Sequence, residues 1–171
     1  MTTSNDILFE GSAGSYREVD LKAWGDIGPL ISFDSDLASL GFELIGDLLC
    51  SAIAHIILRT YVDSSKHTRA FLMVTIKNQA LTVFCVMFDS KFADEAVATT
   101  TTSKVMKDLP AKGAHRKNCE WKGVYDLHGH HQRHVEVLQS QHGLTQPWEN
   151  TLLSIAHSLD SFTIKMSAQQ D

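Results

Sequence analysis

Four histidines lie within seven residues of the chain, at positions 128, 130, 131 and 134. Imidazole titrates near neutral pH without help from its surroundings, and it is the commonest metal ligand in proteins. His130 and His134 are four residues apart, so on a helix their side chains would lie on one face and approach a common point. The pair is therefore the candidate metal site of the sequence, with zinc as the candidate metal.

The pair lacks the other parts of a catalytic zinc site. In an HExxH motif a glutamate beside the first histidine does the acid–base work, and a third ligand completes the coordination. The residue after His130 is His131, and no further HxxxH or carboxylate motif at standard spacing lies downstream. No cofactor is therefore predicted. Two interpretations stay open: structural or solvated histidines, which we favour, and a metal-binding protein or hydrolase built on His130 and His134.

His131 has a different position from this pair. A helix is predicted over 124–142, and at 100° per residue its apolar stripe is Val124, Leu127, His131, Val135, Leu138 and His142. We expect His131, at the centre of the stripe, to be buried against a sheet with a ring nitrogen bonded to a carbonyl or a side chain. It is also the candidate ligand-binding residue if a pocket lies between sheet and helices.

A second group of residues is basic. Residues 104–122 contain six of the fifteen lysines and arginines of the chain. A basic loop with an aromatic side chain can hold an anion or the acidic surface of a partner. The candidate residues for such a surface are Lys112, Arg116, Lys117 and Trp121. The alternative is a solvated connection, which is the commoner origin of such a run.

Composition limits the function classes. The net charge is −5 with neutral histidines, and affinity for nucleic acid comes mainly from lysine and arginine, so we expect no sequence-specific nucleic-acid binding. No triad or phosphate-loop motif is present. The three cysteines are odd in number and not closely spaced, which fits neither a disulfide framework nor a CxxC metal site. Cys119 lies among the cations of residues 104–122, which would favour its thiolate.

The N-terminal residues are polar and lack the basic and apolar regions of a signal peptide. No apolar run approaches the ~20 residues that cross a bilayer. We therefore expect a cytoplasmic protein without a membrane span. Residues 1–20 are predicted to be a flexible segment, and residues 21–171 a single domain.

Hydrophobic periodicity predicts the elements that would position these residues. Strands are expected over 42–50, 56–62, 69–76, 81–88 and 96–102. Short connections between them favour an antiparallel meander of four to five strands. A short helix is predicted before the sheet over 35–40, with Asp34 as its N-cap and Gly41 just past its end. Residues 103–122 are expected to be a connection.

The predicted fold class is α+β. Two C-terminal helices, over 124–142 and 147–166, are expected to pack on one face of the sheet, and Pro147 would lie in the first turn of the second. This second helix has one strong apolar stripe and a thinner line of Leu153, His157 and Ile164 on its opposite side.

The central strands are apolar on both faces. Phe71–Ile76 and Val83–Phe88 lack the alternation of a sheet with one wet face. Together with the second apolar line of the last helix, this favours a non-enzymatic domain that forms a homo-oligomer or binds a protein partner. The alternatives are a small-ligand-binding protein with a pocket between sheet and helices, and the metal-dependent protein described above.

Three short motifs resemble those of an uncharacterised family of small bacterial α+β proteins. Members of this family run LGF…GD, then an FxDG…LxT hairpin, then LxxxH…L. The corresponding residues are Leu40–Phe42 with Ile45–Asp47, Phe92–Glu95 with Thr99–Thr100, and Leu127–His131 with Leu138. Glu95 replaces the glycine, which we expect to change the turn type. The resemblance spans roughly residues 37–165, implies the same order of elements with His131 as a shared feature, and brings no activity.

Overall fold

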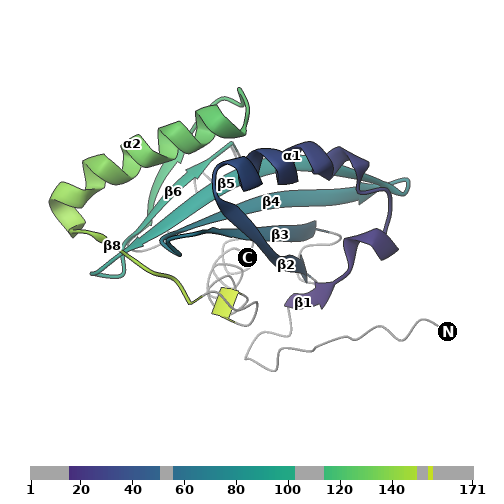
Figure 1. Cartoon of the computed structure of the whole chain (residues 1–171), viewed down its shortest axis with the longest axis horizontal. Coiled ribbons are helices and arrows are strands. Elements are labelled where there is room, and N and C mark those ends of the chain that lie inside the picture. Colours follow the sequence, from purple (N-terminus) through teal and green to yellow (C-terminus); the bar gives the residue numbers. More distant parts are fainter. Residues whose placement is uncertain (1–15, 51–55, 103–113, 150–153, 156–171) are drawn as a thin grey trace, which may run out of the picture.

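The computed structural model describes residues 16–50, 56–102, 114–149 and 154–155, and it contains one mixed sheet with helices on it (Figure 1). The strands are β1 (Tyr16–Val19), β2 (Phe42–Cys50), β3 (Ile56–Asp63), β4 (Thr68–Lys77), β5 (Ala80–Phe92), β6 (Val97–Thr101), β7 (Ala114–Asn118) and β8 (Thr145–Gln146). The helices are a 3₁₀ turn, η1 (Leu21–Ala23), and two α-helices, α1 (Gly28–Ser39) and α2 (Val124–His142).

The sheet confirms the α+β class and is larger than predicted. Its order is β1-β2-β3-β4-β5-β6-β7, and β8 pairs with one end of β5. Each strand from β1 to β5 pairs antiparallel with the next, whereas β6 and β7 are parallel. The predicted count of four to five strands is therefore wrong. The region 103–122, predicted to be a connection, contains β7, whose polar sequence has no strand periodicity.

The N-terminal residues that the structure describes also belong to this sheet. Tyr16–Val19 pair with Asp47–Cys50 of β2, so the sheet begins inside the segment predicted to be flexible. The division into a flexible segment over 1–20 and a domain over 21–171 stays a prediction.

Helix α1 begins earlier than the predicted helix over 35–40. Pro29 lies in its first turn, where proline is tolerated, and the Asp26 carboxylate accepts a hydrogen bond from Gly28 N at 2.9 Å. Asp34, the predicted N-cap, lies inside the helix instead. The predicted end is confirmed, because Gly41 has φ +84° just past α1.

Helices α1 and α2 lie on the same face of the sheet (Figure 1). Leu30 and Leu37 of α1 and Leu127 of α2 belong to one core cluster with the inward side chains of β2 to β5. The opposite face of the sheet is also buried, as the exposed fractions of Leu58, Phe71 and Met87 are 4% or less. The apolar character of the central strands on both faces is thus largely explained within one chain.

In the described part of residues 147–166, the structure differs from the second predicted C-terminal helix. Pro147, Trp148 and Glu149 lie outside any helix, and Ser154–Ile155 are helical. The remainder of 147–166, with the line of Leu153, His157 and Ile164, lies outside the described residues. Trp148 stacks on the Arg69 guanidinium with 4.0 Å from its carbon to the ring centroid, and Arg69 also donates to the carbonyl of Glu149.

A buried ion cluster fastens α1 to the sheet. Arg59 of β3 donates to Asp47 of β2 at 2.8 and 3.0 Å and to Asp34 of α1 at 3.0 Å. The Tyr61 hydroxyl also donates to Asp34. Burial raises the pKa of Asp47 to about 6, against the opposing charge of Arg59. The cluster thus joins three elements through one guanidinium.

Candidate functional site: an open stretch of β5 and the histidine helix

One edge of β5 is interrupted. Ala80 forms an isolated parallel bridge with Asp26. From Val86 onward the same edge is paired again, because Thr102 N donates to Val86 O at 3.1 Å and Val86 N donates to Thr102 Oγ1 at 3.0 Å. Between these points, Leu81–Val83 and Cys85 pair with β4 on one side, and the stretch Leu81–Cys85 pairs with no described strand on the other. At about 3.3 Å per residue, the open stretch is about 17 Å long.

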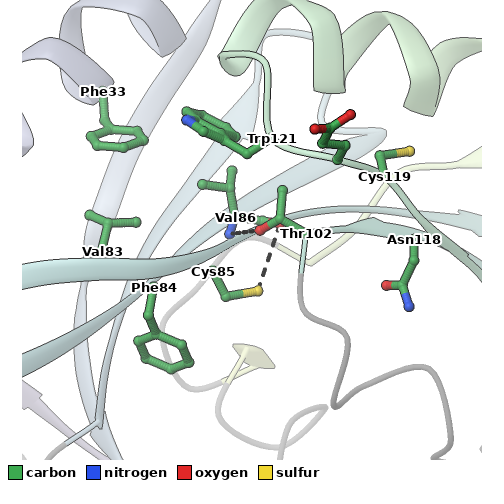
Figure 2. Close-up of a pocket in the computed structure, with 10 residues that line it drawn as sticks. Phe33, Val83, Phe84, Cys85, Val86, Thr102, Asn118, Cys119 and Trp121 are labelled. Atoms are coloured by element: carbon green, nitrogen blue, oxygen red, sulfur yellow. Dashed lines mark hydrogen bonds between the residues drawn. The ribbon is translucent and has the colours of Figure 1, made fainter.

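A cavity of about 650 Å³ lies at this open stretch. Figure 2 shows the lining residues, which come from α1, from β5, from the residue after β6, from the end of β7 and from the segment between β7 and α2. They are Phe33, Val83, Phe84, Cys85, Val86, Thr102, Asn118, Cys119, Glu120 and Trp121. We call this site the β5 groove. It is mainly apolar and lies beside the stretch of β5 that β6 does not reach.

The groove extends over both faces of the sheet, and β5 has a bulge at this point. Met73 pairs with Cys85 and Val74 pairs with Val83, so Phe84 is the additional residue. Figure 2 shows Phe84 on one side of the strand and Val86 and Trp121 on the other. The exposed fractions of Phe84 and Trp121 are 46% and 45%, which is high for large aromatic side chains.

Trp121 is held over the groove by the short connection from β7 to α2. Cys119 N donates to Thr101 O at 2.9 Å, and Gly123, the N-cap of α2, has φ +114°. The Trp121 ring then lies on Phe33 of α1, with 5.7 Å between ring centroids. Burial raises the pKa of the Cys119 thiol, which opposes the thiolate that its cationic neighbours in sequence would favour.

His131 lies outside the β5 groove. Its exposed fraction is 1%, and it is bonded through Nε2 to Ser90 Oγ at 2.9 Å and through Nδ1 to Thr100 Oγ1 at 3.1 Å. Burial, followed by the charges of His134 and His128, lowers the pKa of His131 to about 3. The ring is therefore neutral, and both of its nitrogens are engaged within the protein.

His130 and His134 have different partners. His130 lies 3.5 Å from the Asp126 carboxylate and accepts from Arg133 at 3.2 Å, whereas His134 Nδ1 is bonded to Thr100 Oγ1 at 3.1 Å. Among the residues that the structure describes, no three His, Cys, Asp or Glu side chains are grouped so that they could hold a metal ion. A metal site at this pair stays a prediction.

The predicted basic surface is divided by the sheet. Arg116 and Lys117 are neighbours on β7, so their side chains point to opposite faces. Charge interactions place Arg116 near Asp89 and Lys117 near His134. Trp121 lies in the β5 groove. Lys112 lies outside the described residues.

No family model, curated protein or solved structure matches this chain. The resemblance to a bacterial α+β family therefore stays a prediction. At Glu95, where that family has glycine, the backbone has φ +66°, in the left-handed region that glycine adopts most readily. In the described ranges, neither α-helix combines the length and hydropathy needed to cross a membrane.

Apart from Trp121, the lining of the β5 groove was not predicted as a site. The one signal in the sequence was the apolar run Val83–Phe88, which lacks a polar face. That run predicted a covered strand, and it could not indicate that β6 would stop at Thr101.

Proposed function

We propose that this domain binds an extended peptide segment of a protein partner, which adds a short strand to β5 at Leu81–Cys85. The observation that carries the proposal is the interrupted edge, paired at Ala80 and from Val86 onward, with no strand of the described residues paired to it between these points. An open strand edge offers main-chain donors and acceptors to an incoming strand, which is a common mode of peptide recognition.

The side chains around the open stretch support this mode of binding. Successive side chains of an added strand point to opposite faces of the sheet. One set would contact Phe33 and Trp121 on the helix side, and the other would contact Phe84. Exposed aromatic residues beside a groove are typical anchors of protein interfaces. The groove thus has apolar contacts for both sets, and we expect apolar side chains at alternate positions of the peptide.

A peptide suits the open stretch better than the sheet edge of a second copy does. Asp26 closes one end and Thr102 closes the other, while the bulge at Phe84 interrupts the ladder. A flexible segment of about five residues can enter such a site, whereas a long rigid edge strand would clash with the segments that are already paired at its two ends. We therefore favour partner binding over self-association. A cytoplasmic location is part of the proposal and is supported by Cys119, which forms no disulfide in the part of the chain that the structure describes.

The test begins with a random-peptide display selection on the purified full chain. Enriched peptides are then titrated against the wild type by fluorescence anisotropy. Phe84→Asp places a charge in the groove, and we expect at least tenfold weaker binding, or about 1.4 kcal/mol. Val137→Asp is the matched control, because Val137 is 67% exposed on α2 and does not line the groove.

Three results would overturn the proposal. The first is equal binding by Phe84→Asp and Val137→Asp. The second is a selection that enriches no peptide. The third is a wild-type dimer in light scattering that Phe84→Asp makes monomeric, which would assign the groove to a second copy of the chain. Protection of the Leu81–Cys85 amides from hydrogen exchange on peptide binding would support the proposal directly.

A further inference from the structure

The histidine that ends α2 has one ring nitrogen bonded and the other buried without a partner. His142 Nδ1 lies 2.7 Å from Oδ2 of Asp94, which is in the turn between β5 and β6. Its Nε2 is enclosed by the protein and forms no hydrogen bond to any residue that the structure describes. Among the described histidines, it is the one buried ring nitrogen without a partner. Buried polar atoms are normally bonded, so a missing partner at this position indicates that a further group binds there.

The Asp94 carboxylate determines which form of the neutral His142 ring is present. The ring donates its Nδ1 proton to Asp94, and a lone pair stays on Nε2. This hydrogen bond lowers the pKa of Asp94, so the carboxylate is charged at neutral pH. A histidine that binds a metal usually donates its other N–H to a carboxylate or a carbonyl, which orients the ring and makes the ligating nitrogen more basic. His142 therefore has the arrangement of a metal ligand.

A second imidazole lies against this ring. His115 of β7 pairs with Ala98 of β6 and so shares its face of the sheet, and Ala98 belongs to one core cluster with Leu138 of α2. The ring centroids of His115 and His142 are 4.5 Å apart, with 54° between the ring planes. His115 is half-buried, so solvent reaches the pair.

The spacing of the two rings fits a shared metal ion. Zinc lies about 2.0 Å from a histidine nitrogen and hence about 3.2 Å from the centroid of that ring. Two such rings have centroids about 4.5 Å apart when they meet the ion at right angles, and about 5.2 Å apart in a tetrahedral arrangement. The observed separation of 4.5 Å lies at the lower end of this range.

The surrounding charge also favours a cation. His142 is the last residue of α2, and the carbonyl groups of the last turn give this end of a helix a partial negative charge. Asp94 adds a full negative charge beside the ring. Lys117, two residues after His115 on the same face of β7, is a cation whose charge acts on His134, one helical turn or more from His142.

We propose that His142 Nε2 and His115 together bind a divalent transition-metal ion of the kind that imidazole prefers, such as Zn²⁺. His142 supplies the preformed ligand, Asp94 orients it, and the half-buried His115 turns its ring to direct one nitrogen at the ion. Water completes the coordination, because no three His, Cys, Asp or Glu side chains of the described residues are grouped as a metal site. The ion would join the edge strand β7 to the end of α2. This pair is distinct from His130 and His134, the pair that the sequence predicts.

The test is calorimetric titration of the purified full chain with ZnCl₂ at pH 7.5. We expect the wild type to bind Zn²⁺, and His142→Gln and His115→Gln each to bind it at least tenfold more weakly. His130→Gln is the matched control, because it removes a histidine of the same helix and should leave the affinity unchanged. No binding by the wild type would overturn the proposal. So would an unchanged affinity in His142→Gln or His115→Gln, or a loss in His130→Gln as large as theirs.

Nitrogen NMR of the wild type identifies the ligands even if a variant does not fold. In ¹⁵N-labelled protein, Zn²⁺ should shift the ring nitrogens of His142 and His115. The ring nitrogens of His131 should stay in place, because both are bonded within the protein. A shift of the His130 and His134 rings, with His142 and His115 unchanged, would assign the ion to the pair predicted from the sequence and refute the proposal.

Discussion

Burial of His131 makes the fold sensitive to acid, and the effect can be isolated with one substitution. The pKa of His131 is lowered from 6.5 to about 3, because the ring is enclosed and lies near His134 and His128. The unfolded chain therefore binds a proton at this residue before the folded protein does. The contribution of His131 to stability is fully present above pH 6.5 and is lost as the pH falls toward 3.

The magnitude follows from the two pKa values. One pKa unit corresponds to about 1.4 kcal/mol, so His131 should withdraw about 2 kcal/mol of unfolding free energy between pH 7.5 and pH 5. By pH 3 the loss should approach about 5 kcal/mol, which equals the whole stability of a weakly stable domain. His128 and His134, whose pKa values are also lowered by burial, act in the same direction.

The assay is urea denaturation followed by circular dichroism at pH 7.5, 6.5, 5.5 and 5.0. His131→Asn removes the titrating group, and its amide can still reach one of the two hydroxyl partners. We expect the variant to be less stable than the wild type at pH 7.5, and the difference to shrink by about 2 kcal/mol at pH 5. Asp47 and Asp89, whose pKa values burial raises to about 6, are present in both proteins, and their direct contributions largely cancel. Stability curves that stay parallel from pH 7.5 to pH 5 would refute the reasoning.

The other predictions concern the ion cluster and two glycines. Arg59→Met leaves the buried carboxylate of Asp47 without its cation and should lower the free energy of unfolding by about 3–5 kcal/mol at pH 8. The loss should be smaller at pH 5, because the carboxylate takes up a proton there. Urea titrations at both pH values check this, and an equal loss at both would contradict it. Gly25→Ala should destabilise by about 1–3 kcal/mol in thermal melts, because the added Cβ would lie 2.7 Å from the carbonyl oxygen of Gln79. Gly129→Ala should instead stabilise by about 0.5–1 kcal/mol, because the site is inside α2 and its nearest neighbour is the flexible end of Arg133 at 3.6 Å; a lower Tm than wild type would be the opposite result.

The parts of the fold that follow local patterns could be predicted from the sequence. Helix α2 begins and ends at Val124 and His142, as its apolar stripe and Gly143 predicted. The burial of His131 also followed from that stripe, because its position on the helix face depends only on residue spacing. The predicted helix over 35–40 is shorter than α1, because Pro29 in the first turn marks an earlier start than Asp34 does.

The parts that depend on distant pairing could not be predicted in this way. Strand β7 is polar and becomes a strand through its parallel pairing with β6. The β5 groove exists because Asp26 and Thr102, far from each other in sequence, meet β5 at two separate points. His130 and His134 have the spacing of a ligand pair, but the position of Thr100 on β6 determines where the His134 ring is bonded. The sequence close to β7, to β5 or to His134 does not indicate which distant residues will pair with them.

The Arg59 cluster has a consequence for the order of folding. Asp34 is made before its partner, which lies 25 residues later on β3, and Asp47 lies 12 residues before that same partner. Helix α1 therefore emerges from the ribosome with no guanidinium to dock on, and an isolated helix of 12 residues is only marginally stable in water. We expect α1 to become persistent only after the β2–β3 hairpin has closed. Nascent chains that end before Arg59 would then leave the first helix open to proteases.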